Sequence, residues 1–410
     1  MLADAQHLDN QDALKSMRAA FALPPGIIYL DGNSLGPLPI VARERALEVT
    51  AGQWGTDLIT SWNKHQWIDL PIICGEQIAP IIGAGPDQVV CCDSISVNLF
   101  KVLSAALAMQ GDRKKVITTE DNFPTDIYTV EGLQGQLGPD RCELIKVAEE
   151  DIEHSLDDSV AVLLVTQVNF RSGKMLDMQA LTKAAHKKGI MVVWDLAHSA
   201  GAVPVELDAY YADFAVGCTY KYLNGGPGAP AFIYVAKRHQ AHFQQPLSGW
   251  MGHAAPFAFD NRYVPAQSIR QNLSGTPPVL SMSVLNAALT LWADIDMAHV
   301  RAKSVALSEF FLAALKNLGL DDELRCIAPL IAGERGSQLA FRHAHSYAIC
   351  QAWIDAGVIA DFRAPDILRI GFAPLYLSFT DLWQACEKLK EVMEKKAYLG
   401  EKYQRKLAVT

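Results

Sequence analysis

Short apolar runs alternate with helical patterns through the middle of this sequence, and this constrains its fold more than any other feature. The runs are almost continuously apolar, as expected of strands covered on both faces. They are Lys115–Thr119, Cys142–Val147, Val160–Thr166, Ile190–Trp194, Phe214–Cys218 and Phe232–Val235. Helical patterns cover Ser96–Gln110 and Met178–Lys188, the second with Asp177 as its N-cap. This alternation predicts an α/β fold with a largely parallel sheet covered by helices.

The last third of the chain has a different pattern, typical of a smaller α+β module. Helical patterns there cover Val284–Asp294, Val300–Leu318 and Ser346–Ala356. The strand candidates are Ser337–His343, Val358–Phe362 and Leu368–Phe372. A final helix is predicted near Ser378, where Ser378 and Asp381 fit a capping box. We predict three parts: a segment 1–45 that packs with the small domain or a partner subunit, a large domain 46–275, and a small domain 276–410.

Length and charge narrow the possible functions. The chain has 410 residues and a net charge of −9. This length predicts two domains, and the charge argues against nucleic acid or an anionic membrane as the main partner. The sequence has no apolar run of membrane-spanning length and no signal-peptide pattern. Its eight cysteines are scattered without C-x-x-C spacing, which predicts reduced thiols in a cytoplasmic protein and no metal site.

An acidic residue and a lysine follow two neighbouring predicted strands. Asp195 closes one apolar run, and Lys221 comes 26 residues later, after the next run and before a glycine-rich turn. Ligands of open α/β sheets bind beyond the carboxyl ends of the strands, so both side chains should face one crevice. Pyridoxal 5′-phosphate (PLP) needs this pair, a lysine for the Schiff base and a carboxylate for the pyridinium nitrogen. The alternative is a helix-capping aspartate and a solvated surface lysine.

Two further segments suit the same cofactor. Ser96 lies where a predicted helix begins, and a helix N-terminus offers N–H donors and a favourable dipole to a phosphate. Ser96 could equally be a simple N-cap. Phe123 and Asp126 follow a strand, where an aromatic ring can stack on a pyridine and a carboxylate can accept a hydrogen bond. An aromatic residue in such a loop is more often a packing residue.

These segments, with others, resemble the kynureninase family. The matching motifs are Asn33-Ser34-Leu35-Gly36, Phe123-Pro124-Thr125-Asp126, Asp195-Leu196-Ala197-His198, Tyr220-Lys221-Tyr222-Leu223-Asn224, Gly249-Trp250-Met251-Gly252 and Leu368-Arg369-Ile370-Gly371-Phe372. They run in order over most of the chain. The aspartate–lysine layout alone would indicate only the wider fold-type I group of PLP enzymes, of the aspartate-aminotransferase fold. The Tyr-Lys-Tyr-Leu-Asn segment is much more specific.

The resemblance implies a role for each matching residue. Lys221 would form the Schiff base and move protons, Asp195 would pair with the ring nitrogen, and Phe123 would stack on the ring. The full set implied to contact the cofactor is Ile95, Ser96, Phe123, Asp126, Thr166, Asp195, His198, Tyr220, Lys221, Trp250 and Thr276. Trp250 and Thr276 match positions that reach the phosphate from a neighbouring subunit, which implies a homodimer with shared sites.

The resemblance also implies a substrate and a reaction. Arg369 would clamp the substrate α-carboxylate, with Ser34 and Trp62 in the substrate site. The reaction would be hydrolytic cleavage of L-kynurenine, or of 3-hydroxykynurenine, to anthranilate or its 3-hydroxy form and L-alanine, a step of tryptophan catabolism and of NAD biosynthesis. Tyr220 is the candidate proton donor. A tryptophan at position 62, where animal relatives have histidine, suggests a preference for kynurenine.

Two other classes of function stay open from sequence. One is a different enzyme of the same fold, such as an aminotransferase or a cysteine desulfurase-like lyase, which would need a reactive cysteine in the small domain, where Cys326 and Cys350 lie. The other is a PLP-binding protein without turnover. A nucleotide-binding glycine loop is disfavoured, because the glycines after Lys221 do not fit G-x-G-x-x-G.

Overall fold

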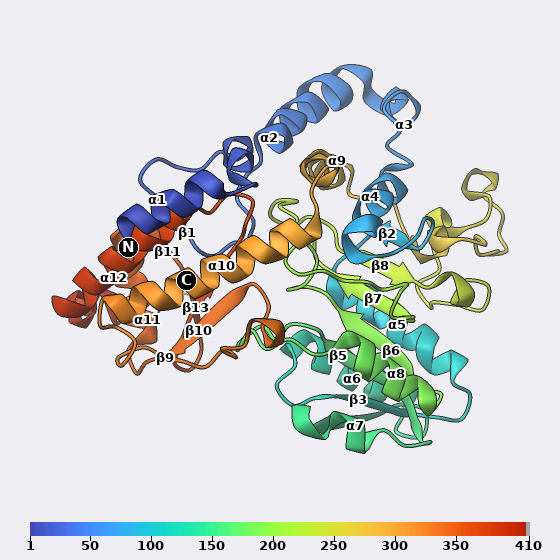
Figure 1. Ribbon diagram of the computed structural model, residues 1–410. Coiled ribbons are helices and arrows are strands. Elements are labelled where there is room, and N and C mark those ends of the chain that lie inside the picture. Colours follow the sequence, from blue (N-terminus) through green and yellow to red (C-terminus); the bar gives the residue numbers. More distant parts are fainter. Residues whose placement is uncertain (407–410) are drawn as a thin grey trace.

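A seven-stranded sheet forms the centre of the larger half of the molecule (Figure 1). The computed structural model describes residues 1–406. In spatial order the strands are β2 (Val89–Cys91), β8 (Phe232–Val235), β7 (Phe214–Gly217), β6 (Met191–Asp195), β5 (Val160–Thr166), β3 (Lys115–Thr119) and β4 (Glu143–Val147). Neighbours from β7 to β4 pair in parallel, and β8 pairs antiparallel with both β7 and β2. The predicted α/β fold with a mostly parallel sheet is therefore confirmed.

Helices cover both faces of this sheet, which explains why its strands are apolar throughout. Side chains of a strand alternate between faces. On β6, Val193 packs into the core that includes α5 (Ile95–Met109), whereas Val192 and Trp194 enter the core that includes α8 (Met178–Lys187). The remaining helices of this region are α6 (Pro124–Leu137) and α7 (Ile152–Ser155).

A second, four-stranded antiparallel sheet organises the C-terminal third, shown in orange and red in Figure 1. Its order is β12 (Asp361–Arg363), β13 (Ile367–Gly371), β10 (Gln338–Arg342) and β9 (Arg325–Cys326). The accompanying helices are α10 (Met297–Asn317), α11 (Ser346–Asp355) and α12 (Phe379–Glu394). The capping box expected at the start of α12 is present, with Ser378 Oγ accepting from the Asp381 N–H.

The N-terminal segment lies against these C-terminal elements (Figure 1). Helix α1 (Leu2–Gln11) packs beside α12, and its Asp9 accepts hydrogen bonds from the backbone N–H groups of Phe379 and Thr380. Strand β1 (Ile28–Tyr29) pairs in parallel with β11 (Val358–Ile359). The three-part division at residues 45 and 275 remains a prediction.

The chain between β1 and β2 is helical and forms the upper edge of the molecule in Figure 1. It comprises α2 (Ile40–Leu47), a π-helix (Glu48–Asp57), α3 (Ser61–Lys64) and α4 (Leu70–Ile78), and α9 (Val279–Leu289) packs against α2 and α4. Within residues 1–406, no single helix is long and apolar enough to cross a membrane. The helical segments 279–292 and 297–317 have the length and composition of a membrane span only when they are taken together. The chain bends by 86° at the break between them.

Two predicted elements, the helix that corresponds to α9 and the strand at 358–362, differ clearly from the structure. Helix α9 starts at Val279, five residues before the predicted Val284, because it begins directly after the two prolines that end the preceding loop. The strand predicted at 358–362 is two strands: β11 pairs with β1, and β12 pairs with β13. The chain changes sheets at Ala360, so apolar character continues while the hydrogen-bonding partner changes.

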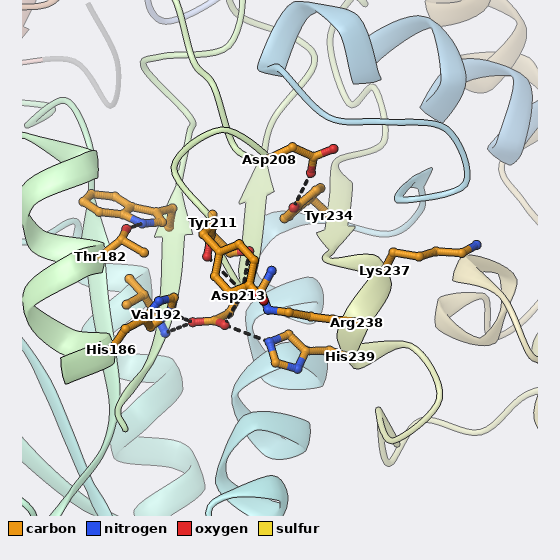
Figure 2. Close-up of polar contacts among 12 residues, drawn as sticks. Thr182, His186, Val192, Asp208, Tyr211, Asp213, Tyr234, Lys237, Arg238 and His239 are labelled. Atoms are coloured by element: carbon orange, nitrogen blue, oxygen red, sulfur yellow. Dashed lines mark hydrogen bonds and ion pairs between the residues drawn. The ribbon is translucent and has the colours of Figure 1, made fainter. Parts of the chain in front are cut away.

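A carboxylate with several hydrogen-bonding partners lies at the amino ends of β6 and β7 (Figure 2). Asp213 accepts hydrogen bonds from the Val192 N–H and from Arg238, and contacts His186 Nε2 at 2.8 Å and His239 Nε2 at 2.7 Å. The Arg238 guanidinium also lies 3.8 Å from the centre of the Tyr211 ring. Through these contacts Asp213 connects α8 and the segment after β8 to the amino ends of the strands, on the side of the sheet opposite their carboxyl ends.

Candidate active site

A cavity of about 270 Å³ opens at the carboxyl ends of the parallel strands. Thr166 ends β5, Asp195 ends β6 and Lys221 follows β7, so adjacent strands deliver their side chains to one place. The lining residues are Asp93, Ser94, Ile95, Ser96, Phe123, Thr125, Thr166, Phe170, Asp195, Ala197, His198, Tyr220, Lys221, Gly228, Ala229 and Ala231. The crevice expected from the spacing of Asp195 and Lys221 is therefore present.

Lys221 lies beside a buried histidine. Its Nζ is 3.0 Å from His198 Nε2. Burial lowers the pKa of His198 well below its usual range, and the nearby charge of Lys221 adds to this. The imidazole is therefore neutral and accepts the Lys221 hydrogen bond. Burial also lowers the pKa of Lys221, so a larger fraction of its amine is unprotonated and nucleophilic.

Two buried carboxyl groups, Asp195 and Asp126, are close enough to Lys221 for its charge to lower their pKa values. Burial raises the pKa of Asp195 to about 6, although the Lys221 charge and a 2.7 Å hydrogen bond from the Ala197 N–H act to lower it. Burial and the charge of Asp195 together raise the pKa of Asp126 well above its usual range. Thr166 Oγ1 lies 3.3 Å from Asp126 Oδ2. A bound cation between these carboxyls would stabilise their charged forms.

The first turn of α5 forms the polar end of the cavity. Ser94, and not Ser96, is the N-cap, because the Val97 N–H donates to Ser94 Oγ. The simple capping role considered for Ser96 is therefore wrong, and its exposed hydroxyl is left on the cavity wall beside Ile95. The first N–H groups of a helix lack intrahelical acceptors and attract anions. This end of the cavity suits a phosphate group.

Aromatic side chains form one wall of the cavity. Phe123 is the residue before α6 and is 43 % exposed, far more than a packing residue would be. Its ring contacts that of Phe170 edge to face, with centroids 5.1 Å apart. Phe170 lies four residues after β5 and was not predicted from sequence, where no motif marked it.

Arg369 is fully buried on β13 and lies next to this wall. Its guanidinium donates to the Phe170 carbonyl, forms an ion pair with Asp361, and donates to Ser34 Oγ at 2.8 Å. The predicted substrate residues Arg369 and Ser34 are therefore in contact. Arg363 also reaches Asp361, at 3.1 Å. Asp361 and Arg363 were missed from sequence, although both lie on the strand that pairs with β13.

Six of the residues assigned by resemblance do not line the cavity of the single chain: Ser34, Asp126 and Arg369, whose contacts are given above, and Trp62, Trp250 and Thr276. Trp62 lies on α3, half-buried against Trp67, with ring centroids 5.9 Å apart. Trp250 is 37 % exposed and Thr276 is exposed. Their assigned roles, in substrate binding for Trp62 and in phosphate binding for the other two, remain predictions.

The groups around the cavity fit PLP. The cavity offers an amine for an aldehyde, a carboxyl group for a ring nitrogen and a helix N-terminus for a phosphate. Two buried polar atoms at the site, Asp126 Oδ1 and His198 Nδ1, have no hydrogen-bond partner within the described part of the chain. Buried polar atoms without a partner are rare in folded proteins and often mark a ligand position. The residues present therefore fit the cofactor that the resemblance implies.

The cysteines give no support to desulfurase chemistry. Cys350 is fully buried within α11, and burial raises the pKa of its thiol well above the usual range. Burial also raises the pKa of Cys326, which lies on β9. A catalytic thiol needs a lowered pKa and access to the substrate, and neither cysteine has them.

Known proteins similar to this chain point to one family. The kynureninase of Burkholderia mallei (strain SAVP1) is 46% identical over 413 residues, and that of Pseudomonas fluorescens is 45% identical over 411. Each match covers 99% of both chains. A family model described as "Kynureninase C-terminal domain" matches residues 300–389.

Solved structures give the same architecture at lower identity. The apo cysteine desulfurase of Thermococcus onnurineus NA1 superposes with a TM-score of 0.76 at 18% identity, covering 93% of this chain and 97% of that one. A C-DES variant with glycine covalently linked to its PLP cofactor gives a TM-score of 0.78 at 17% identity, covering 91% and 99%. These structures show the fold, whereas the full-length sequence relatives show that the chain belongs to the kynureninase family.

Proposed function

We propose that this chain is a PLP-dependent hydrolase that cleaves L-kynurenine with one water molecule into anthranilate and L-alanine. One observation carries the proposal. Lys221, Asp195 and His198 line a single cavity in a chain that is 46% identical to kynureninases over its whole length. Burial raises the pKa of both candidate thiols, Cys326 and Cys350, so a cysteine desulfurase-like reaction is less well supported.

The protein would hold the cofactor at three points. When bound, PLP supplies a pyridinium ring that accepts the electron pair released at the substrate α-carbon. Asp195 Oδ atoms would keep the proton on the ring nitrogen, and the positive charge there would hold Asp195 ionised despite its raised pKa. The N–H groups at Ile95 and the Ser96 hydroxyl would bind the phosphate, and Phe123 would stack on the ring.

Lys221 and Tyr220 would move the protons. Because its pKa is lowered, Lys221 Nζ can take the α-proton as a neutral amine, and His198 orients it through the 3.0 Å hydrogen bond. Burial raises the pKa of Tyr220, so its phenol keeps the proton that it would donate to the carbon freed by bond cleavage. Phe123 and Phe170, which line the cavity, would limit the access of bulk water to the reacting groups.

Arg369 would bind the substrate α-carboxylate. Its guanidinium is already oriented by Asp361, Ser34 and the Phe170 carbonyl. A planar fork fixed in this way loses little conformational entropy on binding a carboxylate. We further propose a homodimer in which Trp250 and Thr276 complete the phosphate site of the partner, and a substrate site in which Trp62 favours kynurenine over its 3-hydroxy form.

The test is an assay of the purified chain with PLP and L-kynurenine. We expect anthranilate and L-alanine in equal amounts, with no product when PLP is omitted. The same preparation is given L-cysteine and 3-hydroxykynurenine. Alanine from cysteine without cleavage of kynurenine would contradict the proposal, and a higher kcat/KM for 3-hydroxykynurenine would contradict only the role of Trp62.

A further inference from the structure

A fully buried lysine lies under the phosphate end of the cavity. Lys101 is in the second turn of α5, and its Nζ donates to Asp93 Oδ2 and to the Asn272 carbonyl, each at 2.6 Å. Removing an ammonium group from water is costly unless it is paired and hydrogen-bonded. A leucine or methionine would fill this position without that cost, so packing alone does not explain Lys101.

Its partner Asp93 belongs to the cavity wall. Asp93 immediately precedes the N-cap Ser94 and has a left-handed backbone, with φ 48°. Its carbonyl accepts from the Ala231 N–H at 2.9 Å, which extends the pairing of β2 with β8 by one residue. Its side chain is 33 % exposed. A carboxylate is therefore held at the rim of a site that must receive an anion.

That arrangement is unfavourable unless the carboxylate is neutralised. A phosphate monoester carries about −1.5 to −2 charge near neutral pH. The negative charge of Asp93 would repel it, and the repulsion is large where the surroundings exclude water. Lys101 lies on the protein side of Asp93, where it cancels this charge without occupying the phosphate position.

The second acceptor of Lys101 connects another segment to the same place. Asn272 ends the short helix Ile269–Asn272 and comes four residues before Thr276. The Cys92 thiol also points to the Asn272 carbonyl, at 3.9 Å. Lys101 therefore joins the α5 phosphate loop to the segment that carries Thr276.

We propose that Lys101 is a positioning residue for the cofactor phosphate: it neutralises Asp93 and so makes the first turn of α5 an effective anion site. The inference rests on the proposed function, since it requires that PLP occupy the cavity. Lys101 does not touch the cofactor and acts through Asp93.

The experiment compares PLP with pyridoxal, which has the same ring and aldehyde but no phosphate. The full chain is freed of cofactor and titrated with each compound, and the dissociation constants are read from the absorbance of the bound form. In Lys101→Met, we expect the dissociation constant for PLP to rise about tenfold or more and that for pyridoxal to change less than about threefold. An equal loss for both compounds, or no loss for PLP, would overturn the inference.

A double variant provides the matched control. Asp93→Asn combined with Lys101→Met removes both charges, so we expect it to recover most of the PLP affinity lost in Lys101→Met. If the ion pair served only to hold the turn, the double variant would bind PLP as poorly as Lys101→Met. Asp93→Asn alone retains a buried lysine and should bind PLP at least as well as the unmodified chain, which keeps the inference testable if Lys101→Met fails to fold.

The unmodified chain separates this inference from the proposed function. If it does not bind PLP in the same titration, both fail. If it binds PLP and Lys101→Met binds it equally well, only the role of Lys101 fails.

Discussion

The buried carboxyl group of Asp195 lowers the stability of the folded chain when no cofactor is bound. Its carboxyl group is buried, and its pKa is raised to about 6 in the folded chain without cofactor. A raised folded-state pKa means that the protonated form is favoured by folding. The contribution to stability is therefore complete below about pH 4 and is lost as the pH rises through about 6. Above that pH, Asp195 is ionised while it is still buried, which destabilises the chain without cofactor.

Asp195→Asn should therefore stabilise the cofactor-free chain in a pH-dependent way. An asparagine keeps an oxygen for the Ala197 N–H but carries no charge. We expect the free energy of unfolding to be about 2–3 kcal/mol higher than in the unmodified chain at pH 8, with little difference at pH 4.5. Denaturant unfolding at both pH values measures this. A variant that is less stable at pH 8 would contradict the expectation. The same change should weaken cofactor binding, because the ring nitrogen loses its counter-ion.

Asp361 is the residue on which the orientation of Arg369 depends. It forms ion pairs with both Arg369 and Arg363, and Arg369 is inaccessible to solvent. Asp361→Ala would leave a buried guanidinium without its carboxylate, which typically costs about 3–5 kcal/mol. We expect a loss of that order in denaturant unfolding, together with a raised KM. Arg363→Gln removes only the more exposed partner and is the control. A loss below about 1 kcal/mol in Asp361→Ala would show that Arg369 is held by its other contacts.

At the scale of elements, Asp213 joins the start of β7 to α8 and to the segment after β8 (Figure 2). Burial acts to raise the pKa of Asp213, but hydrogen bonds from His186 and His239 outweigh it and hold the pKa well below the usual range. The sign is opposite to that of Asp195. The stabilisation is present above about pH 4 and is lost as the pH falls below the ordinary aspartate value.

Asp213→Asn should therefore destabilise the chain at neutral pH. The change leaves Arg238 and two imidazoles without their shared carboxylate, and we expect a loss of about 2–4 kcal/mol at pH 7. The difference from the unmodified chain should shrink as the pH falls below about 4. Thermal unfolding over this pH range tests the sign. Equal stability of the two proteins at pH 7 would mean that the cluster contributes nothing net.

Elements with strong local signals could be predicted from sequence, and those with weak ones could not. Six of the seven strands of the large sheet are continuously apolar runs, and α12 begins at a capping box, so these elements were located to within a residue or two. The three-residue strand β2 was not predicted. Helix α6 was missed because Gly132 and Gly135 weaken its pattern, since glycine is a poor helix former. Ser96 was considered as the cap of α5 because Ser94 and Ser96 are chemically alike, and only the Val97 hydrogen bond distinguishes them.

At the scale of the whole molecule, the candidate site depends on contacts between distant segments. Lys221 and Asp195 could be paired from sequence, because the ends of adjacent parallel strands must meet. Arg369 could be assigned only by resemblance, since its contacts with Ser34, Asp361 and the Phe170 carbonyl join three separate parts of the chain. Contacts between distant segments leave no periodic pattern in the sequence from which they could be predicted.

Shared sites in a homodimer predict complementation between two defective variants. Lys221→Ala removes the amine, and Trp250→Ala removes a group proposed to serve the partner site. A mixed dimer of the two has one site that lacks both groups and one that is intact, by two-fold symmetry. After denaturation and refolding together, we expect up to about a quarter of normal activity. Each variant refolded alone is the control. If the activity of the mixture only equals the sum of the activities of the two controls, the sites are not shared between subunits.

We expect the amine of Lys221 to bind the aldehyde of PLP covalently. The most direct test is to reduce the PLP-loaded chain with borohydride, digest it and locate the labelled peptide by mass spectrometry. We predict a single label on Lys221 and none in Lys221→Ala. A label on another lysine, or no label on the unmodified chain after loading, would contradict the account.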